Sequence, residues 1–137
     1  MIENPSRENI GALLKQAKTI AVIGLSDNPS RTSYGVSKAM QDAGYKIIPV
    51  NPTIKEALGV KAVSSLKEIE EKIDIVNVFR RSEFLPELAE EFLQTDAPIF
   101  WTQLGVVDEE VFNNLSGQER TVIMDRCIKV EHSLSPL

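Results

Sequence analysis

The residues best suited to chemistry lie in the segment VIGLSDNPSRTSYG, residues 22–35. A short apolar run breaks at Gly24, a loop of small and polar residues follows, and a helical pattern resumes at Ser33. Loops of this kind between a strand and a helix bind phosphate, because the free amides at the helix start carry about half a unit of positive charge. Arg31 adds a full positive charge to the same loop. The segment therefore indicates a site for a phosphate-bearing ligand.

Three further arginines closely follow apolar runs that have the composition of buried strands. Arg80 and Arg81 come after DIVNVF, and Arg126 comes shortly after TVIM. A guanidinium group suits phosphate because it can donate two parallel hydrogen bonds. A single exposed arginine more often pairs with a surface carboxylate, to little energetic effect. Taken together with the first loop, however, these arginines favour a phosphate site.

Strand and helix patterns alternate about five times along the chain, which predicts parallel strands joined by crossover helices. Strands are expected where apolar runs are rich in β-branched residues, and helices where apolar residues recur at helical spacing. We therefore predict an α/β fold, with a doubly wound and mainly parallel five-stranded sheet that has helices on both faces. The predicted strands cover residues 19–24, 46–52, 74–79, 98–101 and 121–124, and the predicted helices cover 6–17, 33–43, 65–72, 86–95 and 108–115.

Length and composition indicate a single domain, residues 1–137, with its own core and a C-terminal tail at residues 129–137. The net charge is −5, and no basic face is available to neutralise the phosphates of a nucleic acid. No apolar run is long enough to cross a membrane. The start MIENPSREN lacks the pattern of a secretory signal, and one cysteine cannot form an internal disulfide, so a cytoplasmic location is expected. The acidic segments EIEEK and ELAEEF are expected on the solvent-facing sides of helices.

In a doubly wound sheet, ligands bind beyond the carboxyl ends of the strands, so the residues that follow the strands should share one edge. That edge carries the first loop and three of the four arginines discussed above, which predicts a cationic pocket. The edge residues are Gly24, Leu25 and Ser26 after the first strand, Asn51 and Pro52 after the second, Phe79, Arg80 and Arg81 after the third, Thr102, Gln103 and Leu104 after the fourth, and Asp125, Arg126 and Cys127 after the fifth.

The first loop departs from the common nucleotide-binding motifs. A dinucleotide fingerprint needs three glycines and an acidic residue after the second strand, but here Ser26 and Pro29 replace two glycines and Asn51 ends the strand. The Gly-Lys-Ser/Thr sequence of a P-loop is absent, as are the paired carboxylates with which a phospho-receiver holds magnesium. No metal-ligand spacing occurs. These departures argue against ordinary NAD binding, a P-loop and a metal site.

Four segments in order resemble the small, free-standing bacterial coenzyme A-binding proteins. They are TIAVIGLSDNPSRTSYGVSKAMQDAGYKIIPVNP, DIVNVFRR, WTQLGV and VIMDRCIKVEH, and the resemblance extends from about Ile10 to His132. These proteins are related to the CoA-binding domain of the succinyl-CoA synthetase alpha subunit. The resemblance implies a Rossmann-like fold that binds CoA or an acyl-CoA, with the nucleotide phosphates at the loop after the first strand.

The resemblance also implies residue roles in the first loop. Gly24 and Ser26 would let the backbone approach the pyrophosphate. Arg31 and Ser33 would supply a charge and a hydroxyl group to phosphate. In this longer loop, serine and arginine side chains would thus bind the phosphates, which in a dinucleotide site are bound by backbone amides next to glycines.

At the other strand ends, the resemblance implies that Asn51 and Pro52 border the adenosine. Phe79 and Arg80 would lie along the nucleotide or the pantetheine arm. The remaining members of the predicted CoA-binding set come from their position at the sheet edge: Leu25, Gln103 and Arg126.

Cys127 and His132 are the other residues that could carry chemistry. Cys127 follows the last predicted strand, where nearby cations would favour the thiolate, so disulfide exchange with the CoA thiol is one hypothesis. Free cysteines are more commonly small buried residues, and we favour that interpretation. His132 has no nucleophile or base near it in the pattern and is expected on the surface or packed in the tail. We assign no catalytic residue and no metal ligand.

Two classes of function remain. The favoured class is a binding module that holds CoA without catalysis of its own. The other is an enzymatic role, either as an NAD(P)-binding oxidoreductase or as an accessory subunit of an acyl-CoA enzyme. A complete CoA ligase would also need a phosphohistidine and a nucleotide-grasping domain. The sequence leaves open the particular thioester, a homo-oligomer and a larger enzyme partner.

Overall fold

Five parallel strands form the centre of the protein, described here from a computed structural model over residues 2–135. They are β1 (Thr19–Ile23), β2 (Lys46–Val50), β5 (Ile75–Val78), β6 (Ile99–Thr102) and β7 (Thr121–Ile123). Their order is β2-β1-β5-β6-β7, and every neighbouring pair is parallel. The predicted doubly wound sheet is therefore confirmed. Because the chain runs from β1 to β2 on one side and then crosses back to β5, the winding reverses at β1, which is where such sheets bind ligands.

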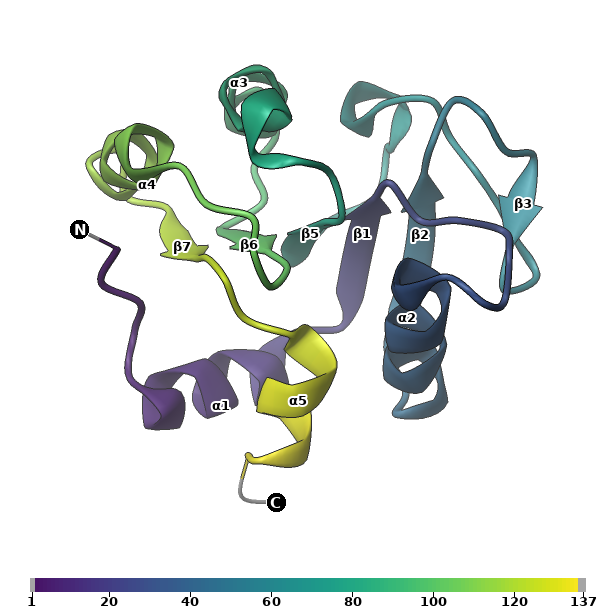
Figure 1. Ribbon diagram of the computed structural model, residues 1–137, viewed down its shortest axis with the longest axis horizontal. Coiled ribbons are helices and arrows are strands. Elements are labelled where there is room, and N and C mark those ends of the chain that lie inside the picture. The colour runs from purple at the N-terminus through teal and green to yellow at the C-terminus, as the bar shows by residue number, and fades with distance from the viewer. Residues whose placement is uncertain (1, 136–137) are drawn as a thin grey trace.

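Helices cover both faces of the sheet (Figure 1). One face carries α1 (Arg7–Gln16), α2 (Thr32–Asp42) and α5 (Ile128–Ser133), and the other carries α3 (Leu85–Leu93) and α4 (Glu109–Ser116). A short antiparallel hairpin, β3 (Glu56–Ala57) and β4 (Val60–Lys61), follows β2. Two single 3-10 turns, η1 (Leu66–Glu68) and η2 (Ser82–Phe84), lead toward β5 and α3.

The core has two layers because successive strand residues point to opposite faces of the sheet. In β1, Ile20 and Val22 pack toward α1, α2 and α5, whereas Ala21 and Ile23 pack toward α3 and α4. All five residues of β1 are buried, as its continuous apolar run predicted. Trp101 in β6 is fully buried and belongs to the core.

Pro49 does not interrupt the sheet because β2 is its edge strand. The Pro49 carbonyl points outward and accepts a hydrogen bond from Val63 N at 3.0 Å. In a strand, the amide and carbonyl of one residue point the same way, so the missing N–H also lies on the outer side. The ladder to β1 stays complete.

The C-terminal segment differs from its prediction. Residues 129–137 were expected to form a tail, but Ile128–Ser133 form α5. Ile128 is buried in the core, and the buried Glu131 carboxylate accepts hydrogen bonds from Nε and Nη2 of Arg7, both at 3.2 Å. These contacts hold α5 against α1. Residues 136 and 137 lie outside the described part of the chain.

The predicted helix at 65–72 is also shorter in the structure. Only Leu66–Glu68 form a 3-10 turn, and the backbone becomes extended at Ile69. Among residues 2–135, none of the helices has the length and apolar character that a membrane span requires.

Candidate functional site

A cavity of about 810 Å³ opens at the carboxyl ends of β1, β2 and β5. This is where the winding of the sheet reverses, the usual ligand position in open α/β sheets. Its walls come from the loop after β1, the ends of β2 and β5, segment 64–65, η2 and α3. The residues of the predicted set that line it are Gly24, Arg31, Asn51, Pro52, Phe79 and Arg80.

Gly24 is required by the close approach of two strand ends. Its φ is +86°, in the left-handed region that favours glycine, and a Cβ placed on it would lie only 2.6 Å from the Phe79 carbonyl oxygen. Gly24 N donates to Val50 O and Phe79 N donates to Ile23 O, both at 2.9 Å. The three strands thus meet tightly at the mouth of the cavity.

The loop between Gly24 and α2 is held by its own side chains. Ser26 N donates to Ser33 Oγ, Asn28 N donates to Ser26 Oγ, and Ser30 N donates to Asn28 Oδ1, each at 3.0 Å. Ser33 is buried, and neither Ser26 nor Ser33 lines the cavity. Arg31 is the N-cap residue of α2, but its side chain makes no capping hydrogen bond. The start of α2 therefore keeps its partial positive charge uncapped by a side chain.

Asn51 ties the end of β2 to the first loop. Its Nδ2 donates to Leu25 O at 3.0 Å, and its Oδ1 accepts from Thr53 N at 2.9 Å and from Thr53 Oγ1 at 2.7 Å. Leu25 is fully buried among the residues under α1, α2 and α5, and it does not line the cavity. Asn51 thus fixes the loop while facing the cavity.

Three positively charged side chains line this cavity. Arg31, Arg80 and Arg81 all line it. Within residues 2–135, Arg31 and Arg80 have no carboxylate partner, whereas Arg81 Nη2 lies 3.2 Å from Glu83 Oε1. The Cζ atoms of Arg80 and Arg81 lie 4.2 Å and 5.6 Å from the centre of the Phe84 ring, which gives two cation–π contacts.

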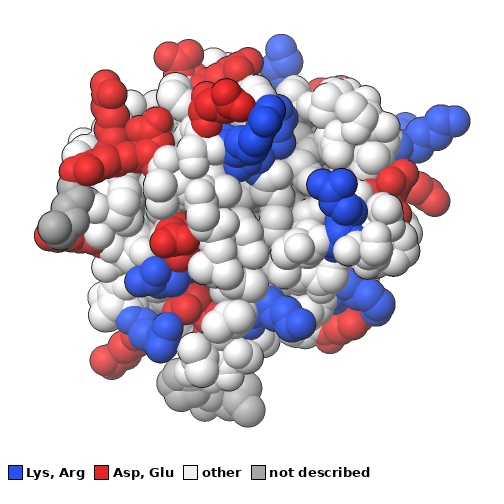
Figure 2. Space-filling model, in the orientation of Figure 1, with Lys and Arg blue, Asp and Glu red and all other residues white. Residues whose placement is uncertain are grey.

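Helix α3 supplies the acidic side of the cavity, which the sequence interpretation missed. Glu87 and Glu91 line it, although ELAEEF was expected to face solvent only. Figure 2 shows acidic side chains over α3 and basic side chains beside them, between α3 and the start of α2. The sequence does place Glu87 and Glu91 one turn apart on a helix that follows Arg80 and Arg81, but it does not show that this side of the helix borders a cavity. The other lining residues outside the predicted set are Ile23, Val50, Thr53, Ser64, Ser65, Arg81, Phe84 and Leu88.

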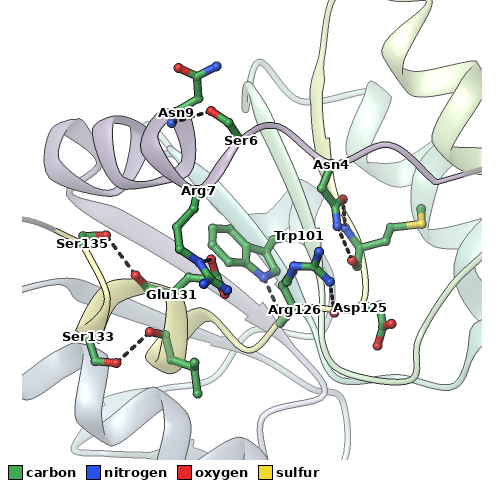
Figure 3. Close-up of polar contacts among 12 residues, drawn as sticks. Asn4, Ser6, Arg7, Asn9, Trp101, Asp125, Arg126, Glu131, Ser133 and Ser135 are labelled. Carbon is green, nitrogen blue, oxygen red and sulfur yellow. Dashed lines mark hydrogen bonds and ion pairs between the residues drawn. The ribbon is translucent and has the colours of Figure 1, made fainter.

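Besides Leu25 and Ser26, three more predicted residues lie along the same sheet edge but outside the cavity. Gln103 is buried, its N donates to Val78 O at 3.1 Å, and its Oε1 has no partner among residues 2–135. Arg126 O accepts from Trp101 Nε1 at 2.9 Å, and its Nη1 donates to Asp125 O at 3.1 Å (Figure 3). Cys127 is 8% exposed and packs in the core at the start of α5.

The cavity thus occupies only the part of the sheet edge formed by the carboxyl ends of β2, β1 and β5, and not the part formed by β6 and β7. Within the described range 2–135, no group of three or more His, Cys, Asp or Glu side chains is arranged to hold a metal ion. The chemistry available in the cavity is that of charge and hydrogen bonding: cationic groups for phosphate, carboxylate acceptors and an aromatic ring.

Comparison with known proteins gives a consistent family relationship. Residues 18–133 match the family model described as a CoA binding domain. The chain is 67% identical over 134 residues to YneT, an uncharacterized protein of Bacillus subtilis, covering 98% of this chain and 99% of that one. The structure of "cell-free ID.343" from Thermus thermophilus superposes with a TM-score of 0.90 at 36% identity, covering 94% of this chain and 98% of that chain.

A longer relative matches only part of the chain. The alpha subunit of ADP-forming acetate–CoA ligase II from Pyrococcus furiosus is 38% identical over 69 residues. The match covers 50% of this chain and 15% of the ligase subunit.

Proposed function

The chain belongs to the CoA-binding domain family, and we propose that it binds coenzyme A, free or as an acyl thioester, in the cavity at the ends of β1, β2 and β5. The observation that carries this proposal is the unpaired positive charge of Arg31 and Arg80, which line the cavity without a carboxylate partner in residues 2–135. CoA carries a diphosphate and a 3′-phosphate, which supply the missing negative charge. Binding, rather than catalysis, is the function that these residues support.

In this proposal the pyrophosphate lies against Gly24 and the start of α2. Gly24 has no side chain to block a ligand, and no side chain caps α2. The serine and asparagine side chains of the loop hydrogen-bond within it, which fixes its shape before a ligand arrives. Arg31 adds a charge-assisted hydrogen bond to phosphate.

The rest of the ligand follows the ends of the neighbouring strands. Asn51 and Pro52 border the adenosine, and Phe79 and Arg80 lie along the nucleotide. The pantetheine arm leaves the cavity over Phe79 and follows the sheet edge past the ends of β6 and β7. That path leads toward the remaining predicted residues, Gln103, Arg126 and Cys127.

A role as an accessory subunit of an acyl-CoA enzyme would also begin with this binding. The chain matches only 15% of the acetate–CoA ligase subunit described above, so ligase chemistry would need domains from elsewhere. An NAD(P)-dependent activity remains the competing function, and the same binding experiment separates the two.

Isothermal titration calorimetry with CoA, dephospho-CoA, acetyl-CoA, NAD and NADP tests the proposal. We expect CoA and acetyl-CoA to bind and dephospho-CoA to bind more weakly, because it lacks one phosphate. Preference for NAD or NADP, or no binding of CoA by the folded protein, would overturn the proposal.

Arginine variants test the site itself. Arg31→Ala and Arg80→Ala should each weaken CoA binding by about 1.5–3 kcal/mol if the lost charge-assisted hydrogen bond is desolvated. Lys38→Ala is the matched control, because Lys38 is on α2 and outside the cavity lining, where it pairs with Asp42. Unchanged affinity in an arginine variant would remove that arginine from the site.

A further inference from the structure

Two glutamates line a cavity whose proposed ligand is strongly anionic. Glu87 and Glu91 lie one turn apart on α3. Neither carboxylate has a hydrogen-bond or ion-pair partner among residues 2–135, although Arg31 and Arg80 line the same cavity. In a site that bound only phosphate, two unpaired carboxylates would weaken binding by repulsion. Their position is explained if the ligand also presents a hydrogen-bond donor to α3.

The same wall offers a surface for a flat group. The guanidinium of Arg80 lies over the Phe84 ring, with Cζ 4.2 Å from its centre. Aromatic rings and guanidinium planes are the two kinds of surface on which nucleotide bases stack. Segment 64–65 lines the cavity as well, and its apolar lining includes the buried side chains of Ile23, Val50 and Leu88.

We propose that the α3 wall seats the adenine of CoA, and that Glu87 and Glu91 accept hydrogen bonds from its exocyclic amino group. The base stacks on the Phe84–Arg80 pair. This inference rests on the proposed function and names the part of the ligand that α3 recognises. The amino group has two N–H donors, which match two carboxylate acceptors about one helical turn apart. The arginines then bind the phosphates while the glutamates select the base.

The proposal predicts an effect opposite in sign to simple electrostatics. If the glutamates are only surface charges, their removal reduces repulsion and tightens the binding of an anionic ligand. If they accept hydrogen bonds from adenine, their removal weakens CoA binding. The direction of the change therefore distinguishes the two cases.

The experiment compares CoA with etheno-CoA, in which the amino nitrogen of adenine is locked into an additional ring and no longer donates. The phosphates and the pantetheine arm are unchanged. Affinities are measured by calorimetry for the wild type, Glu87→Ala, Glu91→Ala and Glu90→Ala. Glu90 is the matched control, because it is an exposed residue of the same helix that does not line the cavity.

We expect the wild type to bind CoA about tenfold more tightly than etheno-CoA, because a hydrogen bond to a charged group is lost. Glu87→Ala and Glu91→Ala should each weaken CoA binding about threefold to tenfold. The same variants should bind etheno-CoA unchanged or more tightly, and Glu90→Ala should bind both ligands as the wild type does. Circular dichroism and urea unfolding confirm that each variant is folded.

Three results would overturn the inference. Tighter binding of both ligands by Glu87→Ala and Glu91→Ala would show that the carboxylates only repel the ligand. Equal wild-type affinity for CoA and etheno-CoA would show that the amino group is not recognised. Both leave CoA binding intact, whereas failure of the folded wild type to bind CoA at all would overturn the proposed function as well.

Discussion

The cavity differs from α1, α5 and the neighbouring part of the sheet edge in how its polar groups are satisfied. At the cavity, Arg31, Arg80, Glu87 and Glu91 have no partner of opposite charge within residues 2–135. These charged groups are therefore free to interact with a ligand, because no ion pair within the described residues holds them.

The anchored region, which we define as α1, α5 and the ends of β6 and β7, shows the reverse (Figure 3). Asn4 forms two hydrogen bonds with the backbone of Met124, both at 2.8 Å, and Arg7 pairs with Glu131. Asp125 Oδ1 accepts from Gly105 N at 2.7 Å. The exception is the buried Oε1 of Gln103, which has no partner within the described residues. Polar groups here are paired with one another and hold the fold together, whereas the charged groups Arg31, Arg80, Glu87 and Glu91 at the cavity have no ion-pair partner within residues 2–135.

The largest expected effect comes from Gly24, where the cavity itself depends on a tight contact. Gly24→Ala adds a Cβ 2.6 Å from the Phe79 carbonyl oxygen at a φ of +86°. The left-handed conformation costs about 1–2 kcal/mol, and the backbone collision adds about 1–3 kcal/mol. We expect the sum to appear as a loss of unfolding free energy in urea denaturation, with weaker CoA binding in the folded fraction.

Gly59→Ala is the matched control for this change. Gly59 has a similar φ of +75°, but a Cβ there would meet nothing within 4 Å. Only the conformational cost of about 1–2 kcal/mol should remain. Equal losses in the two variants would mean that the approach of β5 to β1 is not what requires glycine at position 24.

The next largest effect is expected in the anchored region, where a substitution should change the stability of the fold but not the affinity for CoA. Arg7→Ala removes the partner of the Glu131 carboxylate, whose side chain is only 4% exposed. We expect a loss of about 2 kcal/mol in unfolding free energy, because a buried charged acceptor is left without its donor. CoA affinity should stay within about twofold of the wild type, since neither residue lines the cavity.

A second substitution isolates the cause of that loss. Adding Glu131→Gln to Arg7→Ala removes the buried charge, so part of the stability should return. A drop in CoA affinity of the Arg7→Ala variant would show that the two parts of the molecule are coupled, contrary to the comparison above.

The fold was predictable because its signals are local. The apolar runs that form β1, β5 and β6 have the composition of buried strands, and the parallel order follows from the alternation with helices. α5 was missed because it is short and is stabilised by a distant partner. Arg7 lies 124 positions away from Glu131, and no local pattern links them.

The site was predictable only as far as topology fixes it. The carboxyl ends of parallel strands share one edge of the sheet, where ligands bind. This predicted that the residues after the strands would come together there: Gly24, Arg31, Asn51 and Arg80. The same rule also placed Gln103 and Arg126 on that edge, but the extent of the cavity depends on how α3 and segment 64–65 pack over β1 and β2. Glu87 and Glu91 were missed for a related reason, because acidic residues on an amphipathic helix look solvent-facing until its neighbours are known.

The smallest expected effect concerns Tyr45, whose side chain contacts both α1 and α5. Its hydroxyl donates to Leu14 O, and its ring meets His132 edge-on with centres 5.6 Å apart. Burial raises the pKa of Tyr45 above its usual value of 10.0. The unfolded chain therefore loses the phenol proton at a lower pH than the folded protein does. The resulting stability is complete below about pH 10 and is lost as the pH rises through the folded-state pKa.

Tyr45→Phe should reduce the unfolding free energy by about 1 kcal/mol at neutral pH, because one hydrogen bond is lost. Above about pH 10 the unfolding free energy of the wild type should fall faster than that of the variant. The difference in unfolding free energy between the two proteins should therefore become smaller. Urea denaturation at pH 8 and at about pH 10.5 measures the difference in unfolding free energy between wild type and variant at each pH. Tyr34→Phe is the control, since the Tyr34 hydroxyl has no hydrogen bond within residues 2–135. A gap that stays constant with pH would show that ionisation of Tyr45 does not loosen this contact, and that its anchoring is by packing alone.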